Sequence, residues 1–220
     1  MEEVKMEETL VSKTKHGTTT IGLVCKDGLV ICSEKRATMG SFVAEKKSEK
    51  IFKITDRLLI TTSGTVSDAQ LLTKLIRAEL KLKQVRTDRE ASAKEAANLL
   101  AGLIYGNIRK YSLIPGITQF LLAGYDNAGY HLYDLFVDGS VMECEDYVAS
   151  GSGSIVSYGV LEAMYKKEMS VKEGIDLCIK CLNVAIQRDI GSGNGIVVYT
   201  ITKDGIKKVF DRDIDTTIKP

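Results

Sequence analysis

Residues 17–34 read GTTTIGLVCKDGLVICSE, and this stretch decides the fold. It holds two short runs of β-branched and aliphatic residues, 19–25 and 29–33, on either side of a Lys-Asp-Gly turn at 26–28. Such residues favour strands, and Asp-Gly supplies the positive φ angles of a tight hairpin. The stretch therefore predicts two antiparallel strands that begin shortly after Gly17.

The rest of the chain alternates between strand-like and helix-like hydrophobic patterns. Strand-like runs lie at 43–46, 50–54, 58–63, 118–125, 130–136, 141–144, 195–202 and 206–210. Apolar residues recur at helical spacing in 67–83, 89–110, 154–166 and 170–187. The last of these helices opens with Ser170-x-x-Glu173, the pattern of a capping box. This order predicts an α+β protein in which two antiparallel sheets pack together, with a helix pair outside each sheet.

Composition and charge restrict the class of protein. The chain has 220 residues, of which 44% are hydrophobic and two are proline, and no linker-like segment divides it after residue 20. One domain spanning 18–220 is therefore expected. Thirty basic residues against twenty-nine acidic ones argue against nucleic acid or an anionic membrane as a partner.

The cysteines and the N-terminal segment suggest a cytoplasmic protein. The five cysteines form an odd set and fall mostly in predicted apolar faces, as expected for reduced core thiols, and they do not form a zinc motif. No metal is expected. Residues 1–17 carry seven charges and lack an apolar core, so they resemble neither a signal peptide nor a membrane span.

The junction between Gly17 and Thr18 suggests a nucleophile that needs no histidine. If the chain is cut there, Thr18 becomes an N-terminal residue with a hydroxyl nucleophile and its own α-amine as base. The only histidines are His16 and His131, and neither lies near a serine or cysteine nucleophile signature. Taken alone, three threonines are also typical of the start of a strand, and Lys50 is typical of a solvated lysine.

Further motifs extend this reading along the chain. They are RATMG at 36–40, KIFKI at 50–54, SGTVSDAQ at 63–70, GSGS at 151–154, YGVLE at 158–162 and RDIGSGNG at 188–195. In order and spacing across 17–205, they resemble the proteasome β subunits of the archaeal kind, which are N-terminal-nucleophile hydrolases. The resemblance implies a four-layer αββα sandwich, which the hydrophobic periods also predict.

The resemblance also implies roles for particular residues. Thr18 is the nucleophile, and the propeptide 1–17 is removed autocatalytically at the bond between Gly17 and Thr18. The charge of Lys50 lowers the cost of an alkoxide-like nucleophile, while the α-amine or a nearby water shuttles the proton. The backbone N–H of Gly64 forms the oxyanion hole, where a side chain would crowd the approaching carbonyl. Supporting residues that orient the amine and the lysine are Ser152, Asp189 and Ser192.

Glu34 departs from the family pattern, which has an aspartate to pair with the catalytic lysine. A glutamate keeps the charge and reaches about 1.5 Å further. A misplacement of about 1 Å can cost on the order of a hundredfold in rate. If Glu34 is misplaced, Glu34→Asp raises turnover; if the surrounding structure has adapted to glutamate, the substitution lowers it.

The family's substrate pocket maps onto positions that carry no charge. These positions are Ala37, Ser48, Phe52, Thr62 and Val66, and Thr38 belongs to the same substrate-binding set. An uncharged pocket predicts cleavage after apolar residues. The hydroxyl of Thr62 adds a polar patch at its floor.

The resemblance further implies an assembly. It places the subunit in a seven-membered ring of homologous β subunits stacked with rings of α-type subunits, fed with unfolded polypeptide by an ATP-dependent unfoldase, with no cofactor. One alternative is a weakly active or inactive structural ring subunit beside an active sister, and another is a bacterial-type two-ring relative. A nucleotide site at Gly151-Ser152-Gly153 is disfavoured because the third glycine of that fingerprint is missing.

Overall fold

The computed structural model describes residues 17–113, 115–215 and 217. In chain order its elements are β1 (Thr20–Cys25), β2 (Gly28–Glu34), β3 (Ala37–Met39), β4 (Phe42–Glu45), β5 (Ile51–Lys53), β6 (Leu58–Gly64), α2 (Val66–Thr87), α3 (Ala93–Ile108), β7 (Thr118–Asp126), β8 (Gly129–Leu135), β9 (Val141–Glu143), β10 (Tyr147–Ser150), α4 (Ser154–Met164), α5 (Val171–Arg188), β11 (Gly195–Thr202) and β12 (Gly205–Asp213).

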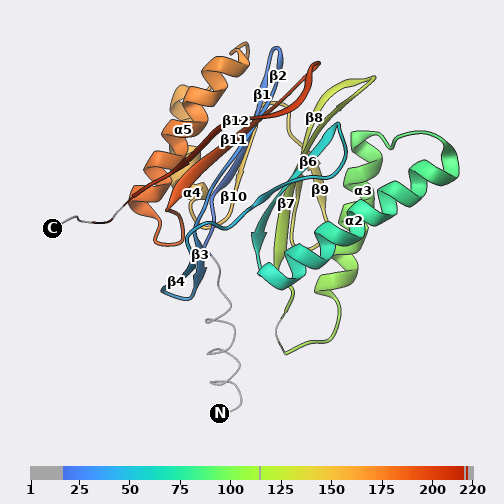
Figure 1. Cartoon of the computed structure of the whole chain (residues 1–220), viewed down its shortest axis with the longest axis horizontal. Helices are drawn as coiled ribbons and strands as arrows, with labels where there is room; N and C mark the ends of the chain where they lie inside the picture. The colour runs from blue at the N-terminus through green and yellow to red at the C-terminus, as the bar shows by residue number, and fades with distance from the viewer. Residues whose placement is uncertain (1–16, 114, 216, 218–220) are drawn as a thin grey trace.

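Two five-stranded sheets form the centre of the molecule (Figure 1). The β1 sheet has the order β10-β1-β2-β11-β12, and the β6 sheet has the order β5-β6-β7-β8-β9, with all neighbours antiparallel. Helices α4 and α5 cover the outer face of the β1 sheet, and α2 and α3 cover that of the β6 sheet. The predicted α+β sandwich of four layers, αββα, is confirmed.

Each boundary between layers has its own apolar cluster. Between the β1 sheet and its helices, the cluster includes Leu23 and Leu182. Between the β6 sheet and its helices, it includes Ile76 and Phe120. The third cluster lies between the two sheets and is built from Leu29, Ile31, Ile51, Leu59, Leu121, Ala123, Leu132, Val148 and Ile201. Because β2 is covered on both faces, all of its side chains are buried, and its sequence does not alternate between apolar and exposed polar residues.

The predicted β1–β2 hairpin is confirmed, with Cys25 paired to Gly28 across the turn. The predicted capping box at Ser170 and Glu173 is also present at the start of α5. Two short strands, β3 and β10, were not predicted. β10 is four residues long and is recognisable as a strand by its pairing with β1, which no local pattern reveals.

Burial agrees with the expected place of most cysteines. Cys25, Cys32, Cys178 and Cys181 are buried, Cys144 is half-buried, and none forms a disulfide. Burial raises the pKa of the Cys25 and Cys181 thiols to about 12, so they are protonated at neutral pH. Within the described ranges, no helix is long and apolar enough to cross a membrane. Apart from Gly17, the predicted propeptide lies outside the described residues.

Candidate active site

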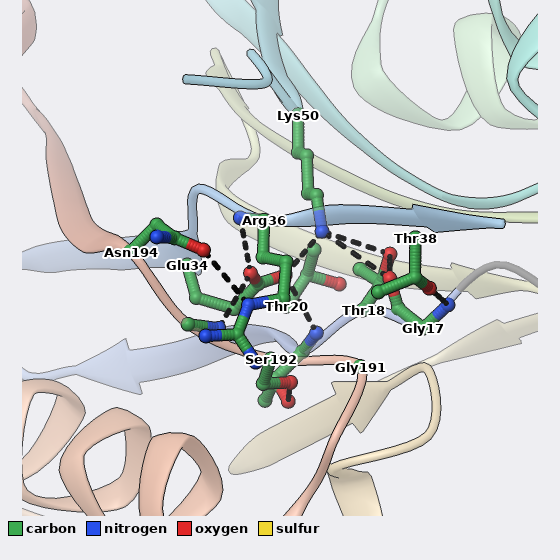
Figure 2. A network of polar contacts seen from close by, with 12 residues as sticks. Gly17, Thr18, Thr20, Glu34, Arg36, Thr38, Lys50, Gly191, Ser192 and Asn194 are labelled. Carbon is green, nitrogen blue, oxygen red and sulfur yellow. Dashed lines mark hydrogen bonds and ion pairs between the residues drawn. The ribbon is translucent and has the colours of Figure 1, made fainter. Parts of the chain in front are cut away.

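Thr18 and Lys50 meet although the strands that follow them belong to different sheets. Thr18 lies two residues before β1, and Lys50 immediately precedes β5. Lys50 Nζ donates a hydrogen bond to Thr18 Oγ1 at 3.0 Å (Figure 2). Both residues are buried, with exposed fractions of 4% for Thr18 and 5% for Lys50. The structure therefore places the lysine against the hydroxyl, away from bulk water.

The Thr18 hydroxyl also lies against the carbonyl of the preceding residue. Thr18 Oγ1 donates to Gly17 O at 2.6 Å, and Lys50 Nζ lies 3.5 Å from the same oxygen. The Gly17 N–H donates to Thr38 Oγ1 at 2.8 Å, which fixes the other side of the peptide (Figure 2). A hydroxyl, a cation and a carbonyl are thus held together at the bond between Gly17 and Thr18.

Glycine is required at position 17 by a close approach of two backbones. A Cβ added to Gly17 would overlap the backbone of Gly191, and a Cβ on Gly191 would overlap that of Gly17. Gly191 belongs to the loop between α5 and β11. The bond between Gly17 and Thr18, the candidate for cleavage, therefore packs directly on this loop, which the sequence pattern alone did not show.

Glu34 reaches Lys50 and forms an ion pair with it. Its side chain is fully buried at the end of β2. The carboxylate also accepts backbone N–H groups from Thr19 at 3.2 Å, Arg36 at 2.6 Å and Gly193 at 3.1 Å. Both carboxylate oxygens therefore have partners, and one of those partners is Lys50.

Burial and attraction act in opposite directions on this pair. Burial raises the pKa of Glu34, and the charge and hydrogen bond of Lys50 oppose that rise. Burial likewise lowers the pKa of Lys50, and Glu34 opposes the fall. Desolvation penalises the charged form of both groups. Lys50 therefore releases a proton more readily, and Glu34 takes one up more readily, than the same groups would in a solvated ion pair.

Three further predicted residues form a chain of hydrogen bonds that ends at Thr18 N. The Thr18 N–H donates to Ser152 Oγ at 3.2 Å, and Ser152 Oγ donates to Asp189 Oδ2 at 2.7 Å. Ser192 Oγ donates to the same Asp189 oxygen at 2.6 Å. Asp189 is the C-cap residue of α5, so the end of this helix sets the position of the network.

Arg36 and Asn194 contribute to the site and were not singled out from the sequence. Arg36 Nε donates to Asn194 Oδ1 at 2.8 Å, and Arg36 Nη1 donates to Ile190 O at 2.8 Å, which ties the loop before β11 to the end of β2 (Figure 2). Asn194 has a φ of +64°, a left-handed conformation that asparagine tolerates. Both residues lie inside motifs at 36–40 and 188–195, which was the available signal.

A cavity of about 380 Å³ opens beside Thr18. Its lining includes Thr18, Lys50 and Gly64, together with all five predicted pocket residues, Ala37, Ser48, Phe52, Thr62 and Val66. Two exposed carboxylates that the sequence reasoning missed, Glu45 and Glu49, also line it. Thr38 lies beside the cavity, where its hydroxyl accepts the Gly17 N–H.

Gly64 has a structural reason to be glycine. Its φ is +101°, and a Cβ there would overlap the carbonyl oxygen of Ile117. The backbone conformation at the end of β6 therefore excludes any side chain, whether or not a substrate carbonyl approaches. This requirement differs from the crowding argument made from the sequence.

Comparison with known proteins shows the family of the chain. A family model described as "Proteasome subunit" matches residues 14–201. The chain is 42% identical to the proteasome subunit beta of Archaeoglobus profundus, over 92% of this chain and 93% of that protein. It is also 42% identical to the proteins of the same name from Ferroglobus placidus, over 94% and 97%, and Methanococcus maripaludis, over 92% and 91%. The chain therefore belongs to the proteasome subunit family and is a β subunit of the archaeal type.

Proposed function

We propose that this β subunit is a threonine-type endopeptidase of the proteasome core, which cleaves unfolded polypeptides through an acyl-enzyme ester on Thr18. One observation carries the proposal: Lys50 Nζ lies 3.0 Å from Thr18 Oγ1, and that oxygen lies 2.6 Å from the Gly17 carbonyl oxygen. A nucleophile, its activating cation and a peptide carbonyl are thus assembled beside a cavity.

The first reaction is removal of the leader. Thr18 Oγ1 attacks the Gly17 carbonyl carbon, the bond from that carbon to Thr18 N breaks, and an ester to Oγ1 forms. The hydroxyl proton passes to the released amine. Water then hydrolyses the ester, which leaves a carboxylate on Gly17, restores the hydroxyl and exposes the α-amine of Thr18. The close packing of Gly17 on Gly191 supports this step because it holds the bond in place.

Peptide hydrolysis repeats the same chemistry on a substrate carbonyl. The α-amine, directly or through a water, takes the Thr18 hydroxyl proton and passes it to the leaving amine. The charge of Lys50 stabilises the developing alkoxide, and the Gly64 N–H is assigned to the oxyanion of the tetrahedral intermediate. Ser152 orients the free amine, since its Oγ accepts the Thr18 N–H before cleavage, and Asp189 in turn holds Ser152. Water finally releases the acyl group.

The proposal extends to the assembly. The relatives are named proteasome subunits, which supports assembly with other proteasome subunits. The proposed assembly is a ring of seven such β subunits, stacked with α-type rings around a chamber in the cytoplasm. Unfolded polypeptides delivered by an ATP-dependent unfoldase are the proposed substrates. An inactive structural subunit is the second candidate. That candidate requires a Glu34 that fails to reach Lys50. The ion pair of Glu34 with Lys50 favours an active subunit instead.

Thr18→Ala tests the function, and Thr18→Ser is its matched control because it keeps the hydroxyl. In assembled particles with no other β-type subunit, Thr18→Ala is expected to retain the leader and to hydrolyse no peptide, whereas Thr18→Ser is processed. Intact mass measures the leader, and a fluorogenic peptide measures hydrolysis. Hydrolysis by Thr18→Ala would overturn the nucleophile assignment. A wild-type particle that loses residues 1–17 and cleaves nothing would favour the structural subunit.

A further inference from the structure

The proposed site is divided between the two sheets. Thr18 and Glu34 extend from β1 and β2, and Ser152 follows β10, all in the β1 sheet. Lys50 precedes β5 and Gly64 ends β6, both in the β6 sheet. The 3.0 Å contact between Lys50 Nζ and Thr18 Oγ1 therefore spans the two sheets. Its length depends on how far apart the sheets lie at this end.

The faces that the sheets turn toward each other change from apolar to polar near the site. Along β6, Leu59 belongs to the inter-sheet apolar cluster, and the next residues on that face are Thr61 and Ser63. The same change occurs along four other strands: Ile31 to Ser33, Leu121 to Gln119, Leu132 to Asp134 and Val148 to Ser150. These polar residues are buried, except for the half-buried Gln119.

Two pairs of hydroxyl groups bridge the sheets in this polar half. Thr61 Oγ1 donates to Thr20 Oγ1 at 3.2 Å while accepting the Leu121 N–H at 3.3 Å. Ser63 Oγ and Ser150 Oγ lie 2.8 Å apart. We refer to these contacts as the Thr20–Thr61 bridge and the Ser63–Ser150 bridge.

Both bridges lie very close to the site along the chain. Thr20 is two residues after Thr18, and Ser63 directly precedes Gly64. Apolar packing is not directional, so the inter-sheet cluster brings the sheets together without specifying particular atom pairs. A hydrogen bond has a narrow range of length and angle, and a buried hydroxyl that loses its partner is costly. The bridges therefore add a directional constraint on the local separation of the sheets to the packing of the apolar cluster.

We propose that the Thr20–Thr61 and Ser63–Ser150 bridges are positioning elements that set the distance of Thr18 from Lys50 and Gly64. The inference rests on the proposed function of Thr18. Thr61 and Ser150 do not line the cavity, so losing either hydroxyl leaves the substrate pocket intact, whereas Ser63 is part of the cavity lining. The effect is then expected in kcat and not in KM, because the reacting groups shift relative to each other.

Two substitutions of Thr61 separate its hydroxyl from its shape. In assembled particles that have lost the leader, Thr61→Val keeps the shape and is expected to lower kcat about tenfold, with KM within about twofold, as for a shift of a fraction of an ångström. Thr61→Ser keeps the hydroxyl and most of kcat. Thr73→Val is the control for loss of a buried hydroxyl elsewhere, since Thr73 Oγ1 donates to Ala69 O inside α2. It is expected to leave kcat unchanged.

The second bridge and a structural readout complete the test. Ser63→Ala and Ser150→Ala are each expected to lower kcat, and the double variant no more than the worse single one, because both remove the same bond. Crystal structures of Thr61→Val and of the double variant should show Lys50 Nζ further from Thr18 Oγ1 than in a crystal structure of the processed wild-type particle. Unchanged kcat with an unchanged distance overturns the inference. If wild-type particles cleave nothing, the proposed function fails, and the distance still decides whether the bridges position the two groups.

Discussion

Glu34 is a buried carboxylate whose contacts leave little freedom of position. One oxygen meets Lys50 and the Thr19 N–H, and the other accepts the N–H groups of Arg36 and Gly193. An aspartate on the same backbone would be shorter by about 1.5 Å and would lose one side of this set. The length of the glutamate therefore matches the backbone N–H groups around it. Held by them, its carboxylate in turn holds Lys50.

Glu34→Asp is accordingly expected to lower turnover. The shortened carboxylate either withdraws from Lys50 or gives up its backbone donors, and a displacement near 1 Å costs roughly a hundredfold in rate. Hydrolysis of a fluorogenic peptide by processed particles measures the effect, and intact mass verifies processing. Glu34→Gln, which keeps the length and removes the charge, is the companion variant. An increase in turnover with Glu34→Asp would show that glutamate is misplaced after all.

The carboxylates at the cavity change the expectation for specificity. Apolar walls still favour apolar side chains before the cut, but Glu45 and Glu49 add negative charge at exposed positions. Glu45 is held by the N–H groups of Lys46 and Lys47, at 2.7 and 2.8 Å. Acidic substrate side chains are therefore expected to be the poorest.

Glu49→Lys tests this charge effect. Because an exposed ion pair contributes about 0.2–1 kcal/mol, the ratio of cleavage after Glu to cleavage after Lys is expected to rise by about 1.4-fold to fivefold. A peptide-library digest measures the ratio. Glu168→Lys makes the same charge change between α4 and α5, outside the cavity lining, and serves as the control. A ratio that moves equally in both variants would assign the effect to overall charge.

At the scale of elements, α5 links the stability of the helix layer to the site. Its N-terminus is closed by the reciprocal capping box of Ser170 and Glu173, and its C-cap is Asp189, which holds Ser152 and Ser192. The helix thus carries a structural device at one end and a functional carboxylate at the other.

Ser170→Ala is expected to destabilise the start of α5 by about 1 kcal/mol without changing kcat. The alanine removes the acceptor of the Glu173 N–H, and the opposite end of the helix remains packed on the β1 sheet. Hydrogen exchange of the first-turn amides of α5 in the assembled particle provides the measurement. Ser170→Asp, which can still cap, is the control. Unaltered exchange in Ser170→Ala would mean that tertiary packing alone holds this turn.

The long elements could be predicted from the sequence because their patterns are local. Helical spacing located α2, α3, α4 and α5, and the Asp-Gly turn located the β1–β2 hairpin. β3 and β10 were not predicted because strands of three or four residues are too short for a hydrophobic pattern and are recognised by their pairing with other strands. The order of the motifs, through the family that it resembles, predicted that Thr18 and Lys50 lie in one site. The roles of Arg36 and the bridging hydroxyls depend on contacts between residues far apart in the chain, which the local hydrophobic pattern of the sequence does not reveal.

At the scale of the whole molecule, the space between the sheets is divided into an apolar half and a polar half. The polar half contains Asp134, a carboxyl group with an exposed fraction of 4%. Gln119 Nε2 donates to Asp134 Oδ1 at 2.8 Å. Burial raises the pKa of Asp134, and the bond from Gln119 opposes the rise without cancelling it. The charged form is therefore a cost to folding.

Asp134→Asn is expected to stabilise the assembled particle at neutral pH. Because the folded pKa is raised, the unfolded chain ionises first as pH increases from about 4, its ordinary value. Wild-type stability then falls as the pH rises toward the raised folded pKa, and a penalty is therefore present at pH 7. Asparagine removes that penalty and can still accept the Gln119 hydrogen bond. Thermal unfolding at several pH values should show a gain at pH 7 that disappears below about pH 4.

Asp138→Asn provides a control of opposite sign. Asp138 is exposed and accepts the Ser140 N–H at 2.8 Å and the Ser140 hydroxyl at 2.7 Å, which lower the pKa of its carboxyl group. Its ionised form favours the folded state above the unfolded pKa, so removing the charge lowers stability at pH 7 or leaves it unchanged. If Asp134→Asn instead destabilises the particle at pH 7, the buried charge has a partner in the assembled ring, and the polar half of the sheet interface supports a charge that the single chain leaves uncompensated.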